Sequence, residues 1–361
     1  QLSKAFYIRT DDRKSDEYKN VPGAMIEDER NPMMGDRGIR LMLENPKITK
    51  IQLAAIKKVV DIGSKKNDKG EYVGRGKFRM RIFFPIVYDP LHFKQIAALC
   101  DEAGLTADRI DRGIMTETPQ SAELRPFLEA GIDFSSTGGN DMTQYSMEVE
   151  RQNALPYFNS LNERTVQCLR IVATLGNEIR RWNRTNRIPQ GLKPVTAGYC
   201  GNWPAVDPIG AIVLYLLDFD SASITIPSMD RTTNDLYALL DTLYGHDELG
   251  IVRVPKDKEQ VAMDLYSLID NKKKQAGLSP ALVEMLPTLK FALDQRHFSI
   301  YDQIDPNAKA DVRDGFEKTS VSDLHLALPF HYRVLEDYDK GEKGDLFVKG
   351  SLEQYRATIE K

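Results

Sequence analysis

The sequence is poor in the features that mark membrane, nucleic-acid-binding and disulfide-bonded proteins. Only three cysteines occur among 361 residues; their separation fits no metal-ligand motif, and their number is typical of a reducing compartment. No apolar run approaches the roughly 20 residues that a membrane-spanning helix needs. The net charge of −4 gives no electrostatic case for binding nucleic acid or an anionic membrane. We therefore expect a cytoplasmic protein that binds neither nucleic acid nor membranes.

Two further absences concern the start of the chain and its loops. The sequence contains no signal peptide, and it begins with Gln1 shortly before an apolar segment, so we expect that an upstream segment is missing. It also contains no glycine-rich nucleotide-binding loop. We therefore do not expect this chain to use ATP by itself.

Over the first 230 residues, apolar strand-like segments alternate with amphipathic helical ones. Strands are predicted over residues 5–9, 81–88, 112–117, 132–135, 194–199 and 221–226, and helices over residues 47–62, 90–103, 162–185 and 209–217. From about residue 231 only helices are predicted, over residues 232–244, 257–271 and 279–295. The alternation predicts parallel α/β architecture, either a β/α barrel or an open doubly wound sheet. The helix over 47–62 rests on six apolar residues at helical spacing: Ile48, Ile51, Ala54, Ala55, Val59 and Ile62.

Charged and polar side chains stand at the ends of several predicted strands. Arg9 ends the first strand, Glu117 ends the third, and Cys200 follows the fifth. Asn140 and Asp141 follow a short strand and a pair of glycines. In a β/α barrel the C-terminal strand ends converge on one mouth, so these side chains would meet there. Alternatively, Asn140 and Asp141 only cap the following segment, as in an ordinary turn.

Four longer motifs occur in order along the chain: Asn-Pro-Met-Met-Gly-Asp-Arg-Gly (31–38), Gly-Ile-Met-Thr-Glu-Thr-Pro (113–119), Gly-Gly-Asn-Asp-Met-Thr-Gln-Tyr (138–145) and Gly-Tyr-Cys-Gly (198–201). Their order and spacing resemble the C-terminal phosphoenolpyruvate/pyruvate barrel of the PEP-utilising enzymes. That family includes PEP synthase, pyruvate phosphate dikinase and enzyme I of the sugar phosphotransferase system. Residues 14–20, Lys-Ser-Asp-Glu-Tyr-Lys-Asn, are most similar to the PEP synthase branch.

The resemblance implies a (β/α)8-type phosphoenolpyruvate/pyruvate barrel in residues 1–230 that lacks its first βα units. Six strands are predicted, whereas the barrels of this family have two more βα units before the strand that ends in Arg9. Residues 231–361 would form a mainly helical extension of unknown role. Because exposed sheet edges pair with other chains, we expect an upstream segment, a partner chain or this extension to cover the gap. We also expect a homo-oligomer.

The resemblance also implies a reaction and the residues that carry it out. The chain would be a PEP synthase-like phosphotransferase, of the pyruvate, water dikinase type, that transfers a phosphoryl group between a phosphohistidine and pyruvate through an enolate. Glu117 and Asp141 would hold Mg²⁺ through carboxylate oxygens, and Cys200 would be the acid that protonates the enolate. The residues that would bind the phosphoryl group, the oxyanion and the rest of the substrate are Arg9, Arg37, Arg81, Asn140 and Arg151.

The implied reaction needs partners, and two other functions stay open. A swivelling phosphohistidine domain and an ATP-binding domain would have to lie on a longer chain or a partner chain. A related barrel can instead act as a Mg-dependent C–C lyase, or as a catalytically silent barrel for assembly or regulation. The three arginines argue against a lyase, and Glu117, Asp141 and Cys200 together argue against a silent barrel. For Arg81 a structural salt bridge is the alternative role, and Arg79 could take its place.

Overall fold

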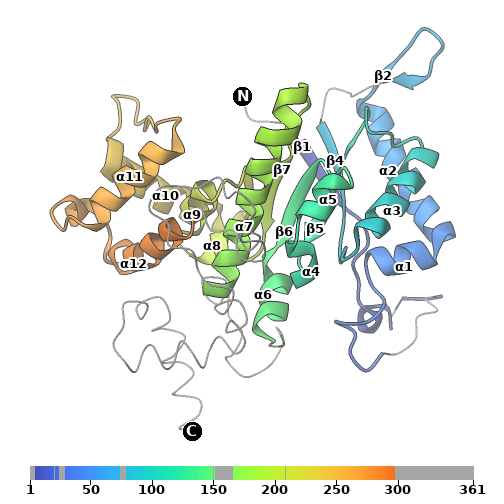
Figure 1. Cartoon of the computed structure of the whole chain (residues 1–361), viewed down its shortest axis with the longest axis horizontal. Coiled ribbons are helices and arrows are strands. Elements are labelled where there is room, and N and C mark those ends of the chain that lie inside the picture. The colour runs from blue at the N-terminus through green and yellow to red at the C-terminus, as the bar shows by residue number, and fades with distance from the viewer. Residues whose placement is uncertain are drawn as a thin grey trace. The chain divides into compact units, whose positions relative to one another are not determined.

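The computed structural model describes residues 5–19, 21–23, 29–73, 79–148, 150, 166–207 and 209–296. Figure 1 follows the chain through its helices and strands. The chain forms two compact units: the N-terminal unit consists of residues 1–137 and 182–196, and the C-terminal unit of residues 138–181 and 197–361. The domain boundary near residue 230 stays a prediction.

The N-terminal unit is built on four parallel strands that pair in the order β1-β4-β5-β6. They are β1 (Ala5–Arg9), β4 (Arg79–Phe84), β5 (Asp111–Thr116) and β6 (Phe134–Gly138). Arg9 pairs with Phe83, and Phe84 pairs with Ile114, so the C-terminal ends of neighbouring strands reach the same edge of the sheet. A small antiparallel hairpin, β2 (Lys65–Lys66) with β3 (Tyr72–Val73), follows the longest helix of this unit.

The helices of the N-terminal unit are α1 (Ile39–Glu44), α2 (Pro46–Gly63), α3 (Pro90–Glu102), α4 (Pro119–Ala122) and α5 (Arg125–Glu129). In Figure 1, α1 and α3 lie next to each other on one side of the strands. α3 begins where it is predicted because Asp89 caps it: the carboxylate accepts a hydrogen bond from the Leu91 N–H at 2.8 Å. Its inner face buries Phe93, Ile96 and Cys100.

α2 carries two apolar stripes, of which the structure buries one. The six residues from which the helix is predicted lie on its solvent side, where Ile51, for example, is 72% exposed. The buried stripe consists of Thr49, Leu53, Ile56 and Val60. Both stripes repeat at helical spacing, so the periodicity predicts the helix but not the face that packs.

β4 is shorter than the predicted strand, which extends to residue 88. The strand ends at Phe84 because Pro85 has no N–H to donate to a neighbouring strand. Ile86 then takes a left-handed backbone conformation, with φ at 55°, and turns the chain away from the sheet. This turn becomes part of the candidate site.

The described residues of the C-terminal unit include two strands, β7 (Thr196–Cys200) and β8 (Ser221–Ser223), which pair in parallel. Its helices are α6 (Gly139–Met147), α7 (Val166–Trp182), α8 (Trp203–Val206), α9 (Gly210–Leu216), α10 (Met229–Tyr244), α11 (Lys258–Ile269) and α12 (Pro280–Asp294). α12 begins as predicted because Ser279 caps it, accepting a hydrogen bond from the Leu282 N–H at 3.3 Å. The helical series predicted after residue 231 is thus present up to the last described residue.

The predicted α/β class is confirmed. In the ranges given above, six parallel strands alternate with helices, as expected for an incomplete (β/α)8 barrel. In the part of the chain that the structure describes, every helix is too short or too polar to cross a bilayer.

The two stripes of α2 provide a matched test of the packing. Ile56 is 7% exposed and Ile51 is 72% exposed, so the same substitution should have different effects at the two positions. We expect Ile56→Ala to lower the free energy of unfolding by about 2–5 kcal/mol, because it leaves a cavity. Ile51→Ala should change it by no more than about 0.5 kcal/mol. Equilibrium denaturation measures both, and an equal loss would show that the Ile51 face is also packed.

Candidate active site

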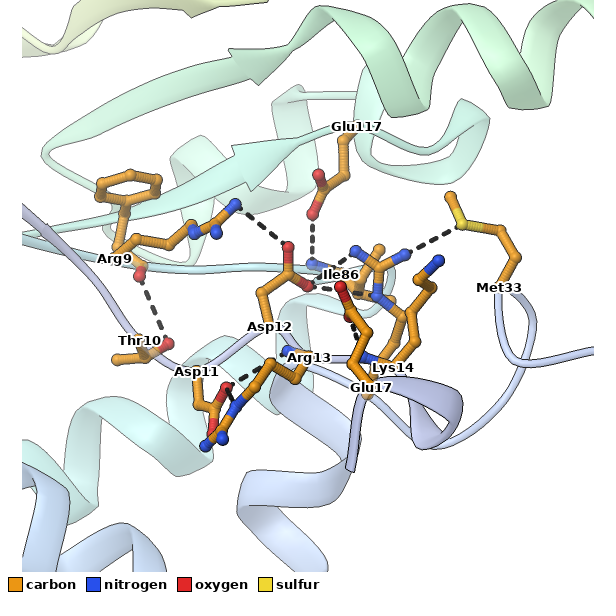
Figure 2. A network of polar contacts seen from close by, with 12 residues as sticks. Arg9, Thr10, Asp11, Asp12, Arg13, Lys14, Glu17, Met33, Ile86 and Glu117 are labelled. Carbon is orange, nitrogen blue, oxygen red and sulfur yellow. Dashed lines mark hydrogen bonds and ion pairs between the residues drawn. The ribbon is translucent and has the colours of Figure 1, made fainter. Parts of the chain in front are cut away.

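The candidate site lies in the N-terminal unit, at the C-terminal edge of its parallel strands. Arg9 is the last residue of β1, and Glu117 directly follows β5. Between them in the sheet, β4 ends and leads into the turn at Ile86. Figure 2 shows the side chains and turns that gather at this edge. Side chains at this edge of parallel strands are the ones that α/β proteins use for ligands.

Asp12 joins the two arginines of this edge. Its Oδ2 accepts a hydrogen bond from Arg9 Nη1 at 3.2 Å, and its Oδ1 accepts from Arg37 Nη2 at 2.8 Å and Arg37 Nε at 3.2 Å. The side chains of Asp12 and Arg37 are 6% and 4% exposed, whereas that of Arg9 is 50% exposed. One carboxylate therefore holds two guanidinium groups, and the three side chains together keep one net positive charge.

Arg37 is held in place through its own backbone neighbours. The N–H of Ile39 donates to the carbonyl of Pro85 at 3.0 Å, which docks this loop on the turn that follows β4. Gly38 has φ at 58°, and a Cβ at this position would lie 2.5 Å from the Pro85 oxygen. Glycine is therefore required here, both for the left-handed conformation and for the close approach of the two backbones.

Glu117 is a fully buried carboxylate that is held by the same turn. The backbone N–H of Ile86 donates to Glu117 Oε1 at 2.7 Å, and Figure 2 shows the two facing each other. A β-branched residue with positive φ is a genuine outlier. Strained backbone of this kind clusters at functional sites, so the conformation of Ile86 is a structural reason to place function at Glu117.

The turn after β1 is fixed by hydrogen bonds on both sides of Asp12. Asp11 accepts hydrogen bonds from Arg13 Nε at 2.9 Å and from the Tyr18 hydroxyl at 2.7 Å. Glu17 accepts from the backbone N–H of Lys14 at 2.7 Å. These bonds leave the backbone of Asp12 little freedom, so its carboxylate has a defined direction.

Arg81 lies at a different level of the sheet from Arg9 and Arg37. It donates to the buried carboxylate of Asp111 at 3.2 Å and to the Tyr7 hydroxyl at 2.5 Å. Asp111 also accepts hydrogen bonds from Lys193 Nζ at 2.6 and 2.7 Å. Asp111 begins β5 and Glu117 follows its end, a separation of about 20 Å at 3.3 Å per residue. The structure thus places Arg81 in a buried ion-pair network, and its substrate-binding role stays a prediction. The side chain of Arg79 lies outside the described residues.

Three further predicted residues belong to the C-terminal unit. Asn140 and Asp141 lie in the first turn of α6, and Cys200 ends β7. The backbone N–H of Asn202 donates to Asn140 Oδ1 at 3.4 Å, so the structure brings Asn140 next to the turn that carries Cys200. Arg151 lies outside the described residues.

The three cysteines differ in their surroundings. Cys200 is half-buried, whereas Cys100 and Cys168 are buried. Burial raises the pKa of the Cys100 thiol to about 12, so this thiol stays protonated at neutral pH. Cys168 is 3.8 Å from the Thr143 hydroxyl oxygen. The contrast leaves Cys200 as the cysteine that solvent can reach.

Sequence reasoning missed two contributors to the site, Asp12 and Ile86. Asp12 stands in a charged stretch for which neither a strand nor a helix is predicted, and Ile86 falls within the strand predicted over residues 81–88. The closeness of Asp12 to the predicted Arg9 was the one available signal. Among the described residues, no three His, Cys, Asp or Glu side chains gather in a way that could hold a metal ion.

Comparison with known proteins points to one family. A sequence model described as "PEP-utilising enzyme, PEP-binding domain" matches residues 2–239. The probable phosphoenolpyruvate synthase of Archaeoglobus fulgidus is 33% identical over 233 residues, which cover 62% of this chain and 27% of the relative. The phosphoenolpyruvate synthase of Pyrococcus furiosus is 33% identical over 161 residues, covering 42% of this chain and 18% of the relative.

A second group of relatives is more distant in sequence. The phosphoenolpyruvate-protein phosphotransferase of Buchnera aphidicola is 26% identical over 241 residues, covering 63% of this chain and 36% of the relative. In all three relatives the matched stretch is a minor part of the longer protein, about a quarter of the Archaeoglobus one.

The turn beside Asp12 makes a prediction about pH. Burial alone would raise the pKa of Asp11, but hydrogen bonds from Arg13 and Tyr18 to its ionised form lower the pKa from 3.8 to about 2. Because the folded-state pKa is depressed, this stabilisation is complete above the unfolded value near 3.8 and is lost as the pH falls through about 2.

Carboxyl ¹³C titration by NMR measures this pKa directly. We expect a midpoint near 2 for Asp11 and a higher midpoint in Tyr18→Phe, because that variant removes a hydrogen bond to the charged form. An Asp11 midpoint at its ordinary value would mean that the turn is not held as the structure shows.

Proposed function

The chain belongs to the PEP-utilising enzyme family, through the PEP-binding domain that residues 2–239 match, and from this premise we propose that it transfers a phosphoryl group between a phosphohistidine on another domain and pyruvate. In the direction of PEP, the methyl group of pyruvate loses a proton, and the enolate oxygen takes the phosphoryl group from the histidine nitrogen. In reverse, the P–O bond of PEP breaks and the methylene carbon gains the proton. The observation that carries the proposal is that Arg9 and Arg37 both bind one carboxylate, that of Asp12. They do so at the edge of the sheet where the buried Glu117 follows β5.

Arg9 and Arg37 are suited to hold the phosphoryl group. A guanidinium presents several N–H donors in one plane and matches phosphate oxygens with paired hydrogen bonds. The net positive charge of Arg9, Arg37 and Asp12 adds attraction for an anionic substrate. We retain Asn140, Arg81 and Arg151 as further substrate-binding residues in the proposal, on the strength of the sequence resemblance.

Glu117 and Asp141 are the proposed magnesium ligands. Mg²⁺ is commonly bound by one or two carboxylates together with substrate oxygens and water, so the absence of a three-residue cluster among the described residues is compatible with such a site. Both residues supply carboxylate oxygens, which suit a hard cation. When bound, Mg²⁺ would supply charge stabilisation for the enolate and orient the phosphoryl group.

Cys200 is the proposed acid and base for the carbon atom. A thiol has an ordinary pKa of about 8.5, so it can give or take a proton near neutral pH. Cys200 ends a strand and is half-buried, which leaves it accessible to a substrate. The phosphohistidine and ATP-binding domains are proposed to lie on a longer chain or on a partner, since this chain matches about a quarter of its Archaeoglobus relative.

The metal ligands can be tested by calorimetry with PEP. We expect Glu117→Gln or Asp141→Asn to abolish the Mg²⁺ dependence of PEP binding, because an amide is a much weaker magnesium ligand than a carboxylate. Glu123→Gln is the matched control, since Glu123 is exposed and has no proposed role. Binding that stays as dependent on Mg²⁺ as in the wild type would remove both residues from the metal site.

The role of Cys200 can be tested without the partner domains. Proton NMR in D₂O follows the exchange of the pyruvate methyl protons in the presence of Mg²⁺ and inorganic phosphate. We expect Cys200→Ala to slow this exchange by about 10²-fold or more, the usual contribution of a general acid or base. Cys168→Ala is the control and should exchange at the wild-type rate. Exchange at the wild-type rate in Cys200→Ala would assign the proton transfer to another group.

A further inference from the structure

We propose that Asp12 is a positioning residue that ties the exposed Arg9 side chain to the buried Arg37, so that the Arg9 guanidinium is held in place to meet a phosphoryl group. This role rests on the proposed function, because it names the residue that prepares that site for PEP. Neither the sequence motifs nor the family comparison assigns a role to this carboxylate. The proposal follows from its contacts.

The two oxygens of Asp12 are divided between the two arginines. Oδ1 accepts hydrogen bonds from both Nε and Nη2 of Arg37, and Oδ2 accepts one from Nη1 of Arg9. Without a shared anion the two cations would repel each other, and their long side chains would take several rotamers. The carboxylate therefore fixes both the distance between the guanidiniums and the plane of Arg37.

The carboxylate itself stands on a rigid turn. Before it, the backbone N–H of Thr10 donates to the Phe83 carbonyl at 3.2 Å, which extends the pairing of β1 with β4. After it, Tyr18 and Glu17 hold the turn through bonds to Asp11 and Lys14. A supporting group on a fixed backbone is what a preorganised binding site requires.

Exposure separates the ligand-facing Arg9 from the two side chains that support it, Asp12 and Arg37, the latter of which is 4% exposed. The side chain of Asp12 is 6% exposed, and that of Arg9 is 50% exposed. A solute that reaches this edge therefore meets Arg9 before it meets the carboxylate. A guanidinium carries five N–H donors, and the contact with Asp12 occupies Nη1 of Arg9, so the same side chain can bind Asp12 and a phosphoryl oxygen together.

Asp12 could act by positioning the arginines or only by its charge, and the two roles predict opposite effects of Asp12→Asn on PEP binding. If only the net charge mattered, removing a carboxylate would make the site more positive and strengthen the binding of an anion. If Asp12 positions the arginines, the variant binds PEP more weakly. An amide can accept from one arginine through its oxygen, but its NH₂ group faces the donors of the other.

The experiment compares PEP with pyruvate, which lacks the phosphoryl group. Calorimetry in Mg²⁺ gives both dissociation constants for the wild type, for Asp12→Asn and for the control Asp101→Asn, whose exposed carboxylate pairs with Arg112 on the neighbouring strand β5. We expect Asp12→Asn to weaken PEP binding by about tenfold or more, the usual effect of losing a charge-assisted hydrogen bond. Pyruvate binding should change by less than about twofold, and Asp101→Asn should bind both as the wild type does.

Each other outcome has a definite meaning. Unchanged or tighter PEP binding in Asp12→Asn would overturn the positioning role, and so would an equal weakening of PEP and pyruvate, which marks general disruption. If Asp12→Asn does not fold, Asp12→Glu decides: it keeps the charge but moves the carboxylate by one methylene, and the ratio of the two constants must still shift against PEP. A wild-type protein that binds no PEP would overturn the proposed function itself, whereas wild-type binding with an unaffected variant overturns only the role of Asp12.

Discussion

The candidate site depends on the parallel register of β1, β4 and β5. Arg9 pairs with Phe83, and Phe84 pairs with Ile114, so the residues after the three strands reach one edge of the sheet. A slip of one residue would turn each side chain to the opposite face. Burial opposes such a slip, because Ile82 and Ile114 are fully buried. The apolar core of the N-terminal unit thereby determines where Glu117 stands.

At this edge, charge rather than apolar area decides the geometry. Removing Arg37 and Asp12 from water is costly unless hydrogen bonds replace those of the solvent. Arg37 places Nε and Nη2 on Asp12 and Nη1 at 3.1 Å from Met33 Sδ. The second cation, Arg9, then makes the group positive overall. A buried pair beside an exposed cation therefore combines a fixed framework with a place for an anion.

Much of the fold could be predicted from the sequence, and the exceptions have physical reasons. The helices follow their periodicity, yet α2 has two stripes with the same period, and only the tertiary contacts select Ile56 over Ile51. An arginine suits phosphate wherever it stands in a sequence, so residue type alone favours a substrate-binding role for Arg81. The strand register, however, places Arg81 opposite Asp111, to which it donates a hydrogen bond. Arg37, the buried partner of Asp12, lies 25 residues away in the sequence, beyond the reach of any local pattern. The strand-end rule, in contrast, correctly located Arg9 and Glu117 at one edge.

The central claim is that this edge binds PEP together with a metal ion. Calorimetric titration of the wild-type chain with PEP, first with Mg²⁺ and then after a chelator has removed it, tests the claim most directly. We predict saturable binding of PEP with Mg²⁺ and loss of that binding with the chelator. Failure to bind PEP under both conditions, or equal binding under both, would contradict it.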